Sequence, residues 1–250
     1  MKRILTLILV CCTLITQAQH KETRKIAQLK SVSVSSAIQV EYVHSNKNEV
    51  VVECQNEDHL ALLLTEVKNG LLEIKYKPNT RIKTNGYNKV IVYSDSKLIG
   101  AKATTSGRMR IVSPIHSPEF FIDVNSAAKI EINELTSEKV VVNAQTSGTV
   151  KAEINSTTLD VNTSSSSGVI LTGKTNKANV NMSSSSDIDF NTLNIDSLSI
   201  VGSSSAKLFF NTVNNLENRL SSSAKVVYQK RPNQIRVNQI SSGAKLSQNN

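Results

Sequence analysis

Residues 164–171 read SSSSGVIL, residues 183–190 read SSSSDIDF, and the phrase that they share decides the fold. Each copy is a polar run that closes on Ser, Gly or Ala and is followed by a short apolar strand. Between about Thr104 and Leu246 the phrase returns eight times. The residues that close the polar runs are Gly107, Ala128, Gly148, Ser167, Ser186, Ala206, Ala224 and Ala244. Successive members are 21, 20, 19, 19, 20, 18 and 20 positions apart, and a fixed period near twenty is typical of a solenoid.

Apolar columns run through these copies. The second position after each closing residue is always apolar: Met109, Ile130, Val150, Val169, Ile188, Leu208, Val226 and Leu246. Two places further on come Ile111, Ile132, Ala152, Leu171, Phe190, Phe210 and Tyr228. A third column, further upstream in each copy, consists of Val142, Val161, Val180 and Ile200. The position between the first two columns is mostly charged in the early copies, and this in-out alternation indicates β-strands.

The repeat therefore predicts an all-β protein. A coil of this size cannot bury its apolar face alone, but stacked coils share a core and pair their backbone groups at roughly 4.8 Å per step. We expect a right-handed, parallel, single-stranded β-helix (a β-solenoid) with coils of about 20 residues.

The Ser runs allow two interpretations. Ser-rich segments often act as flexible linkers, so a disordered or glycosylated tract is one alternative. Their regular placement favours the other, in which each run forms a corner that stacks on the corner of the next coil. Small hydroxyl residues fit a tight corner and can bond to backbone groups there.

The start of the chain has the features of a secretory signal peptide over residues 1–18. A basic beginning precedes an apolar run, and Ala18 suits cleavage. Lipidation at Cys11 or Cys12 is the alternative, although both lie early for it. After cleavage only Cys54 remains, so we expect no internal disulfide and a bacterial periplasmic or surface setting.

Two regions follow the signal peptide: a β-rich N-terminal entry region at 19–100 and the solenoid repeats at 101–250. In the first, Asn69-Gly70 predicts a hairpin turn and Asn85-Gly86 a second turn. The segment from Glu57 to Leu64 suits one helical turn. We expect the entry region to cap the first coil, because an uncapped solenoid exposes its core and strand edges. Whether it is a separate domain stays open.

Several segments together resemble a known bacterial family. They are Ser36-Ala37-Ile38-Gln39-Val40-Glu41, Gly70-Leu71-Leu72-Glu73-Ile74, Val90-Ile91-Val92-Tyr93 leading to Thr105-Ser106-Gly107, and the later Ser-Ser-Ser-Ala-Lys copies. On these residues the chain resembles the putative auto-transporter adhesin, head GIN domain family, over roughly residues 26–246. The resemblance implies a β-solenoid that is secreted or displayed on the surface of Gram-negative bacteria. It implies no catalytic or binding residues.

The formal net charge of +9 is concentrated at the C-terminal end, where residues 201–250 carry 7 basic and 1 acidic side chain. In the last three copies the residue after the closing position is Lys207, Lys225 or Lys245. Lysines at strand spacing repel one another unless an anion lies across them. We therefore predict that these three bind a polyanion: a sulfated, phosphorylated or uronic-acid polymer. The alternative is a solvated basic face that blunts the solenoid's edge.

Paired carboxylates are the best candidate for enzyme chemistry. Asp187 and Asp189 share the outer face of one strand, and we expect Asp160, on the preceding coil, to lie near them. β-Helix polysaccharide lyases and glycosidases divide acid and base roles between such groups. Neighbouring copies place Gly168 and Lys207 at the Asp187 position, so no acidic column exists and we expect no catalytic site.

The remaining chemistry-bearing residues predict no metal site and no cofactor. The four histidines, His20, His44, His59 and His116, lack ligand spacing. Cys54 lies in a strand pattern and is expected to be a buried small apolar residue rather than a nucleophile. The sequence contains no phosphate loop, nucleophile elbow or nucleic-acid reader module, and no apolar stretch of membrane-spanning length follows the signal peptide.

Together these features predict a secreted or cell-surface β-solenoid, not an enzyme, with a structural or adhesive role. We expect it to bind surface glycans or envelope proteins. A carbohydrate-active enzyme and a periplasmic protein-binding scaffold are the alternatives. The sequence leaves open the ligand, the oligomeric state, and the choice between periplasm, outer membrane surface and extracellular space.

Overall fold

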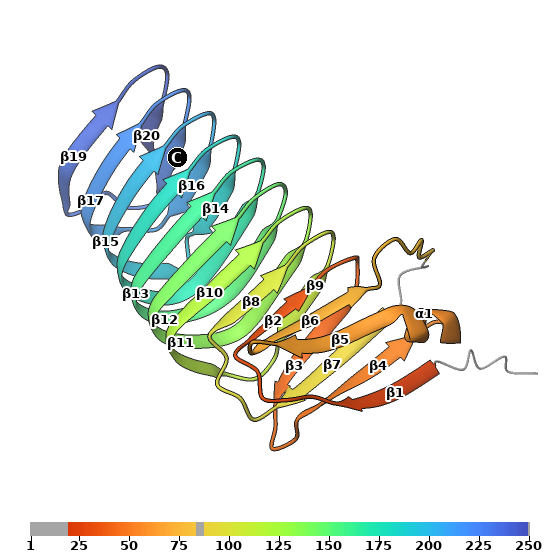
Figure 1. The fold of residues 1–250 in the computed structure, drawn as a ribbon. Coiled ribbons are helices and arrows are strands. Elements are labelled where there is room, and N and C mark those ends of the chain that lie inside the picture. The colour runs from red at the N-terminus through yellow and green to blue at the C-terminus, as the bar shows by residue number, and fades with distance from the viewer. Residues whose placement is uncertain (1–19, 84–87, 250) are drawn as a thin grey trace, which may run out of the picture.

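The computed structural model describes residues 20–83 and 88–249. The expected signal peptide at 1–18 and the expected turn at Asn85-Gly86 lie outside the described residues. The rest of the chain is nearly all β, and its parallel coils stack into a solenoid (Figure 1). The expected fold class is confirmed.

The described elements, in chain order, are β1 (His20–Lys25), β2 (Ser31–Val34), β3 (Gln39–His44), β4 (Glu49–Cys54), α1 (Glu57–Leu62), β5 (Leu63–Lys68), β6 (Leu71–Tyr76), β7 (Asn88–Ser94), β8 (Gly100–Ala103), β9 (Arg108–Ile111), β10 (Ile115–Val124), β11 (Lys129–Ala144), β12 (Thr149–Thr163), β13 (Gly168–Met182), β14 (Asp187–Phe190), β15 (Leu193–Gly202), β16 (Lys207–Phe210), β17 (Val213–Leu220), β18 (Lys225–Tyr228), β19 (Gln234–Ile240) and β20 (Lys245–Gln248).

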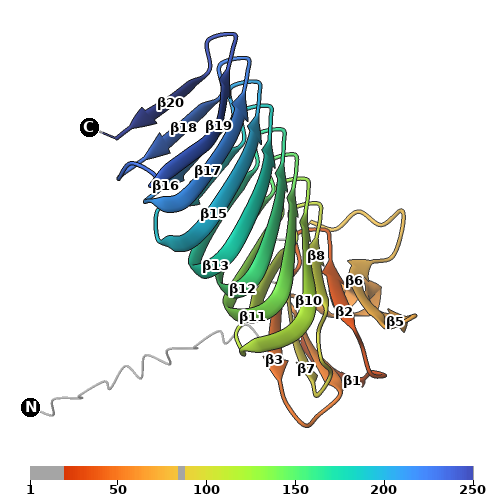
Figure 2. The same cartoon turned by 90° about the vertical axis from the view of Figure 1, so that its left-hand side faces the viewer.

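Each coil contributes to two parallel faces. The corner face contains β7 and the strand segments that directly follow the corners, in the order β7, β3, β9, β11, β12, β13, β14, β16, β18 and β20. The second face has the order β6, β2, β8, β10, β11, β12, β13, β15, β17 and β19. The long strands β11, β12 and β13 bend and take part in both. Figure 2 shows the coils side by side along the solenoid.

The three apolar columns of the sequence form the core. The first is buried from Met109 through Val226, and only Leu246, in the last coil, is partly exposed. The second is buried through Phe210, and the third in all four of its members. Matching residues of neighbouring coils are paired in register, as in Ile130 with Val150. The predicted alternation is therefore correct along the whole repeat.

Each Ser-rich corner is a tight β-turn. Ser165 and Ser166 have φ values of 54° and 59°, and the N–H of Ser167 donates to the carbonyl of Ser164 at 3.3 Å. Two left-handed central residues closed by this bond make a type I′ turn. The same pair of positive φ values recurs at Thr105-Ser106, Ser126-Ala127, Thr146-Ser147, Ser184-Ser185, Ser204-Ser205, Ser222-Ser223 and Ser242-Gly243.

Backbone hydrogen bonds join these corners along the solenoid. The N–H of Ser166 donates to the carbonyl of Ser184, and that of Ser185 to the carbonyl of Ser204, both at 2.9 Å. A non-glycine residue in the left-handed region costs about 1–2 kcal/mol, and one bond per corner offsets part of it at about 0.5–1.5 kcal/mol. The interpretation of the Ser runs as stacked corners is confirmed, and backbone groups make the bonds between them.

Two of the closing residues, Gly107 and Gly148, lie too close to the backbone of the neighbouring coil to carry a side chain. A Cβ on Gly148 would lie 2.6 Å from the carbonyl oxygen of Val124, and one on Gly107 would lie 3.0 Å from that of Val34. Larger side chains at these positions would push adjacent coils apart.

The entry region contains a further coil that the repeat pattern missed. Ser36 and Ala37 have φ values of 63° and 57°, so a corner of the same kind connects β2 to β3. β2 pairs with β8 and β3 with β9, both parallel. Two features hid this coil: Ile38 occupies the position of the small closing residue, and residues 45–99 separate it from the next corner.

Around this coil, antiparallel strands extend both faces. β5 and β6 form the predicted hairpin, with Asn69 and Gly70 at φ values of 51° and 80°, and this prediction is confirmed. β4 and β1 add to the edge of β7. The predicted helical turn is α1, which Asn56 caps. None of the helices within 20–83 or 88–249 is long and apolar enough to span a membrane. The division at residue 100 and the capping role stay predictions.

The last coil is open on its far side. β19 and β20 each pair with one neighbour, β17 and β18, and Ile240 is 41% exposed. One coil earlier, Asn218 lies in register with Ile200 of the core and is fully buried. Neither the nitrogen nor the oxygen of its side-chain amide has a hydrogen-bond partner among the described residues.

Candidate functional site

Two rows of outward side chains cover the corner face, because alternate residues of a strand point to opposite sides. The first row contains Gln39, Arg108, Lys129, Thr149, Gly168, Asp187, Lys207, Lys225 and Lys245. The second row, two residues further along each strand, contains Glu41, Arg110, Glu131, Lys151, Ile170, Asp189, Phe209, Val227 and Ser247. Basic side chains gather at both ends of this face, with Asp187 and Asp189 between them.

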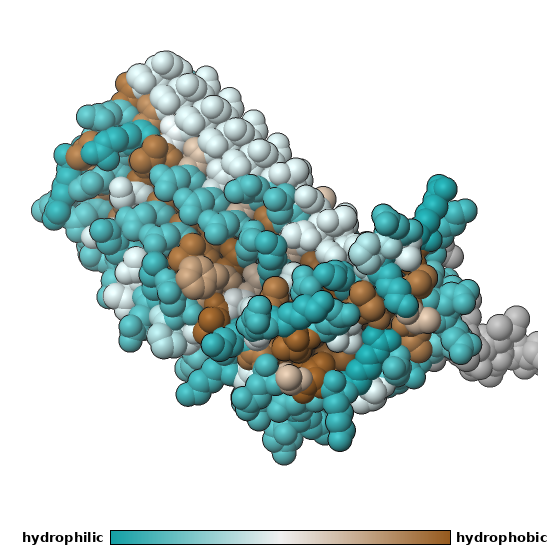
Figure 3. Space-filling view, in the orientation of Figure 1, coloured by the Kyte–Doolittle hydropathy of each residue, from teal (hydrophilic) through white to brown (hydrophobic). Residues whose placement is uncertain are grey.

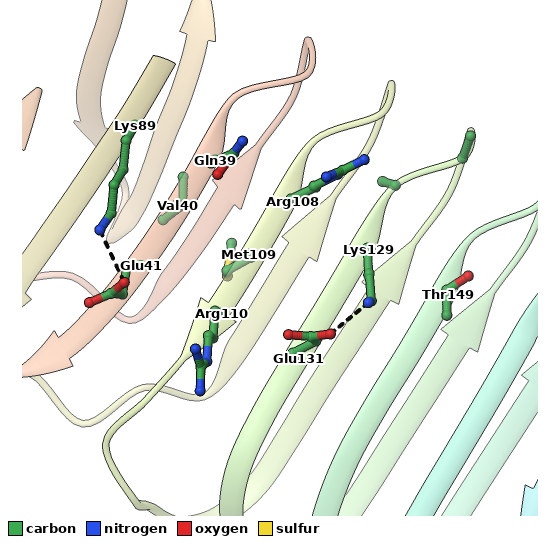
Figure 4. A pocket seen from close by; sticks show the side chains of 12 residues that line it. Gln39, Val40, Glu41, Lys89, Arg108, Met109, Arg110, Lys129, Glu131 and Thr149 are labelled. Carbon is green, nitrogen blue, oxygen red and sulfur yellow. Dashed lines mark ion pairs between the residues drawn. The ribbon is translucent and has the colours of Figure 1, made fainter. Parts of the chain in front are cut away.

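At the N-terminal end of the corner face lies a hollow of about 620 Å³. We call it the arginine hollow and define it by Lys89, Glu41, Arg108, Arg110, Lys129 and Glu131. Strand pairing assembles it from distant parts of the sequence, since β7, β3, β9 and β11 are neighbours. Figure 4 shows the two arginines projecting from β9 between an ion pair on either side.

The two glutamates of the arginine hollow are engaged by the two lysines. Lys89 Nζ lies 3.2 Å from Glu41 Oε2, and Lys129 Nζ lies 2.6 Å from Glu131 Oε1. The hydrogen bond from Lys129 is the main cause that lowers the pKa of Glu131, against the opposing effect of burial, and the nearby charges of Arg110 and Lys151 add to it. Both glutamates are at least one-third exposed, so these pairs contribute little to stability.

The two arginines of the hollow take no part in these ion pairs. Arg110 lies in register between Glu41 and Glu131, yet among the described residues neither Arg110 nor Arg108 has an ion pair within 4.0 Å. The lining therefore holds four cationic and two anionic side chains.

The three lysines of the predicted polyanion site lie side by side on neighbouring strands. Lys207, Lys225 and Lys245 are in register on β16, β18 and β20, and all three are exposed. We call them the lysine stripe. Adjacent strands lie about 4.8 Å apart, so the stripe is a short row of positive charge on an open surface.

The acidic residues considered for catalysis are not brought together. Asp187 and Asp189 lie on the corner face, but Asp160 lies on the second face, where it is in register with Asn179 and accepts a hydrogen bond from it at 2.8 Å. The bend in β12 separates the two positions. The expectation that Asp160 lies near the other two is wrong.

The histidines and the cysteine are dispersed over the entry region and β10. His59 is buried in α1 with its ring edge toward Tyr76. Within the described ranges no three His, Cys, Asp or Glu side chains are grouped so as to hold a metal ion. Cys54 is buried as predicted, and burial raises the pKa of its thiol to about 11, which makes it a poor nucleophile.

The surface over the corners is a continuous pale ridge of small, weakly polar residues, with strongly polar side chains beside it (Figure 3). The exposed corner residues, mostly Ser and Thr, form this ridge. It is uniform along the solenoid, whereas the charged groups of the corner face are not.

Sequence reasoning identified the lysine stripe but not the arginine hollow. Arg108 and Lys129 belong to the same outward column as the stripe, and this was the available signal. Lys89 and Glu41 come from the entry region, whose pairing with β9 no spacing in the sequence reveals.

Comparison with known proteins finds one matching family model and several solved structures with a similar fold. The family model described as "Putative auto-transporter adhesin, head GIN domain" matches residues 28–232. A crystal structure of a putative adhesin from Parabacteroides distasonis superposes with a TM-score of 0.84 at 19% identity, covering 94% of this chain and 98% of that one. One of a putative adhesin from Parabacteroides merdae gives a TM-score of 0.83 at 15% identity with the same coverage.

A third solved structure, described as a putative lipid binding protein from Parabacteroides distasonis, gives a TM-score of 0.79 at 19% identity, covering 94% of this chain and 98% of that one. At these identities the likeness establishes the fold alone. A search of the curated proteins found no match.

Proposed function

This chain belongs to the putative auto-transporter adhesin, head GIN domain family, and from that premise we propose that it is an exported, cell-surface β-solenoid with a structural and adhesive role. It presents its corner face to acidic glycans of the cell envelope or of neighbouring surfaces. The signal-peptide features of residues 1–18 support export.

The observation that carries the proposal is the lysine stripe on a rigid, regular surface. Backbone bonds hold β16, β18 and β20 in register, so the backbone positions of the three lysines keep their spacing without a ligand. Because binding needs no ordering of the backbone, only the side chains lose conformational entropy. A linear polymer with repeated negative charges matches this row, and its attraction should weaken as salt screens it.

An enzymatic role has no comparable support. Asp187 and Asp189 share the corner face, but Asp160, the third carboxylate considered, is separated from them by the bend in β12. The solved structures compared are described as adhesins or as lipid binding, not as enzymes.

The test is binding of the purified chain to a glycan array and to immobilised acidic polysaccharides, at low and at physiological salt. We expect binding to sulfated or uronic-acid polymers that decreases with salt. Replacing Lys207, Lys225 and Lys245 together by Gln should lower affinity about tenfold or more, at a few tenths to one kcal/mol per exposed charge.

A matched control removes the same charge from the second face. Lys102, Lys139 and Lys177 are exposed there, and their replacement by Gln should leave polymer binding nearly unchanged. If both triple variants lose the same polymer affinity, the attraction depends on net charge alone, and the stripe is rejected as the site. Absence of binding to every glycan would reject the proposed function and favour the alternative of a protein-binding scaffold.

A further inference from the structure

The arginine hollow differs from the lysine stripe in shape and in the type of cation. The stripe is a row of exposed ammonium groups, whereas the hollow lies between the outward side chains of β3, β9 and β11 and has a volume of about 620 Å³. Small-molecule sites usually have volumes of about 300–1,000 Å³. The hollow is therefore large enough for a sugar residue, which an open strand surface cannot enclose.

The two arginines belong to one strand and to the same face of it. Arg108 and Arg110 are two residues apart on β9 and point to the same side, so their Cα atoms are about 7 Å apart. A guanidinium carries its donors in a planar fork that matches the oxygens of a carboxylate or sulfate. Figure 4 shows the two guanidinium groups directed away from each other along β9, so both forks reach the oxygens of a single anionic group only after the side chains rotate toward it.

The ion pairs flanking the arginines limit the charge of the ligand. Glu41 and Glu131 neutralise Lys89 and Lys129, and they place a carboxylate on either side of Arg110. A chain of closely spaced negative charges would meet these carboxylates and be repelled. One negative group on an otherwise polar molecule would not be.

The rest of the lining lacks an aromatic ring and combines the polar Gln39 and Thr149 with the apolar Val40, Met109, Ala127 and Ala128. Thr149 contributes a hydroxyl, and the corner residues Ala127 and Ala128 form a low rim. Without an aromatic face for a sugar to stack on, recognition relies on charge-assisted hydrogen bonds, and it should depend on salt.

We propose that the arginine hollow binds the carboxylate or sulfate group of one acidic sugar residue, with Arg108 and Arg110 as its contacting cations. The proposal rests on the proposed function, because it concerns the same class of ligand, an acidic glycan. It adds a site that holds one sugar residue of that glycan, whereas the lysine stripe contacts several residues along the polymer. Carboxylate and sulfate share the required chemistry, and the experiment separates them.

The experiment is calorimetric titration of the purified chain with four probes: a uronic-acid disaccharide, a sulfated disaccharide, a neutral disaccharide and inorganic sulfate. Binding of one or both acidic disaccharides, with none of the neutral one, supports the proposal and identifies the group. Equal binding of all three disaccharides would overturn it, and so would binding of inorganic sulfate as tight as that of the acidic disaccharides. Absence of binding by either acidic disaccharide would also overturn it.

The variants are Arg108→Gln with Arg110→Gln, and the conservative pair Arg108→Lys with Arg110→Lys. The Gln pair should lower acidic-disaccharide affinity by about tenfold per arginine. The Lys pair should retain part of it, because the charge stays and the planar fork is lost. Unchanged thermal unfolding confirms that each variant is folded, as expected for outward side chains, and undiminished affinity in the folded Gln pair would overturn the proposal.

Comparison with the lysine-stripe variant separates the two proposals. The stripe variant should lose polymer retention and keep disaccharide binding. The Arg108→Gln, Arg110→Gln pair should lose disaccharide binding. Loss of disaccharide binding in the stripe variant would overturn the hollow as the site. If the unchanged protein binds the acidic disaccharide but retains no acidic polymer, the proposed function of the stripe is rejected and the proposal for the arginine hollow is not affected.

Discussion

Replacement of Gly173 by Ala tests whether close backbone contact between coils limits the sequence of this solenoid. Gly173 lies in β13 with a φ of 99°, and a Cβ built on it would lie directly against the carbonyl oxygen of Ile154 in the neighbouring strand β12. An alanine at this position is therefore both strained and overpacked. Since the contact is with backbone, no side-chain rotation relieves it.

The expected cost follows from these two effects. The left-handed conformation costs about 1–2 kcal/mol for a residue with a Cβ, and the overlap costs about 1–3 kcal/mol. We expect the free energy of unfolding to fall by about 3 kcal/mol, or the melting temperature by about 6–12 °C for a chain of this size. Calorimetry and urea unfolding followed by circular dichroism measure both quantities.

Gly168 provides the matched control on the same strand. A Cβ there would meet only the side chain of Thr149, at 3.9 Å. Gly168→Ala should therefore leave the melting temperature within about 2 °C of the parent or raise it slightly, because alanine restricts the unfolded chain. Similar effects of the two substitutions would refute the argument from backbone contact.

Three further predictions follow from buried or paired groups. Asn218→Leu should raise the free energy of unfolding by about 1–3 kcal/mol, because it removes a buried amide without partners; Asn179→Leu, which removes an outward amide bonded to Asp160, is the control, and equal stabilisation by both would contradict the reasoning. The Cys54 thiol should resist alkylation at pH 8 until the chain unfolds, and rapid alkylation of the native chain would refute this. Because folding raises the pKa of this thiol from 9.0 to about 11, the thiol of the unfolded chain ionises first. The free energy of unfolding should therefore fall as pH rises from about 9 to about 11. Glu131→Gln should raise the affinity of the arginine hollow for an acidic disaccharide by a few-fold, because Lys129 loses its partner; calorimetric titration measures the change, and unaltered or weaker binding would contradict it.

The period of the repeat made the solenoid predictable, because the same apolar positions return in every copy from Met109 to Val226. The geometry of the corner was not predictable in the same way. Two consecutive residues with positive φ usually require Asn or Gly, and Ser165-Ser166 gives no such signal. Bonds to the next coil stabilise the conformation there, and a single copy of the sequence contains no information about its stacked neighbour.

The two candidate sites differ in the same way: one follows the coil period in the sequence and the other does not. The lysine stripe was found because its members repeat at the coil period. The arginine hollow was not, because Lys89 and Glu41 reach it through the pairing of β7 with β3 and of β3 with β9. Asp160 shows the converse error, since belonging to the preceding coil did not place it on the same face as Asp187.

The in-register stacking also makes the solenoid a molecular ruler. Between β9, which carries the arginines, and β16, where the lysine stripe begins, lie β11, β12, β13 and β14, so the two basic groups are about 24 Å apart. Duplicating one coil would lengthen that interval by about 4.8 Å, and deleting one would shorten it by as much. Gain or loss of whole coils can thus tune the reach between two charged contacts in fixed increments, without altering the residues of either.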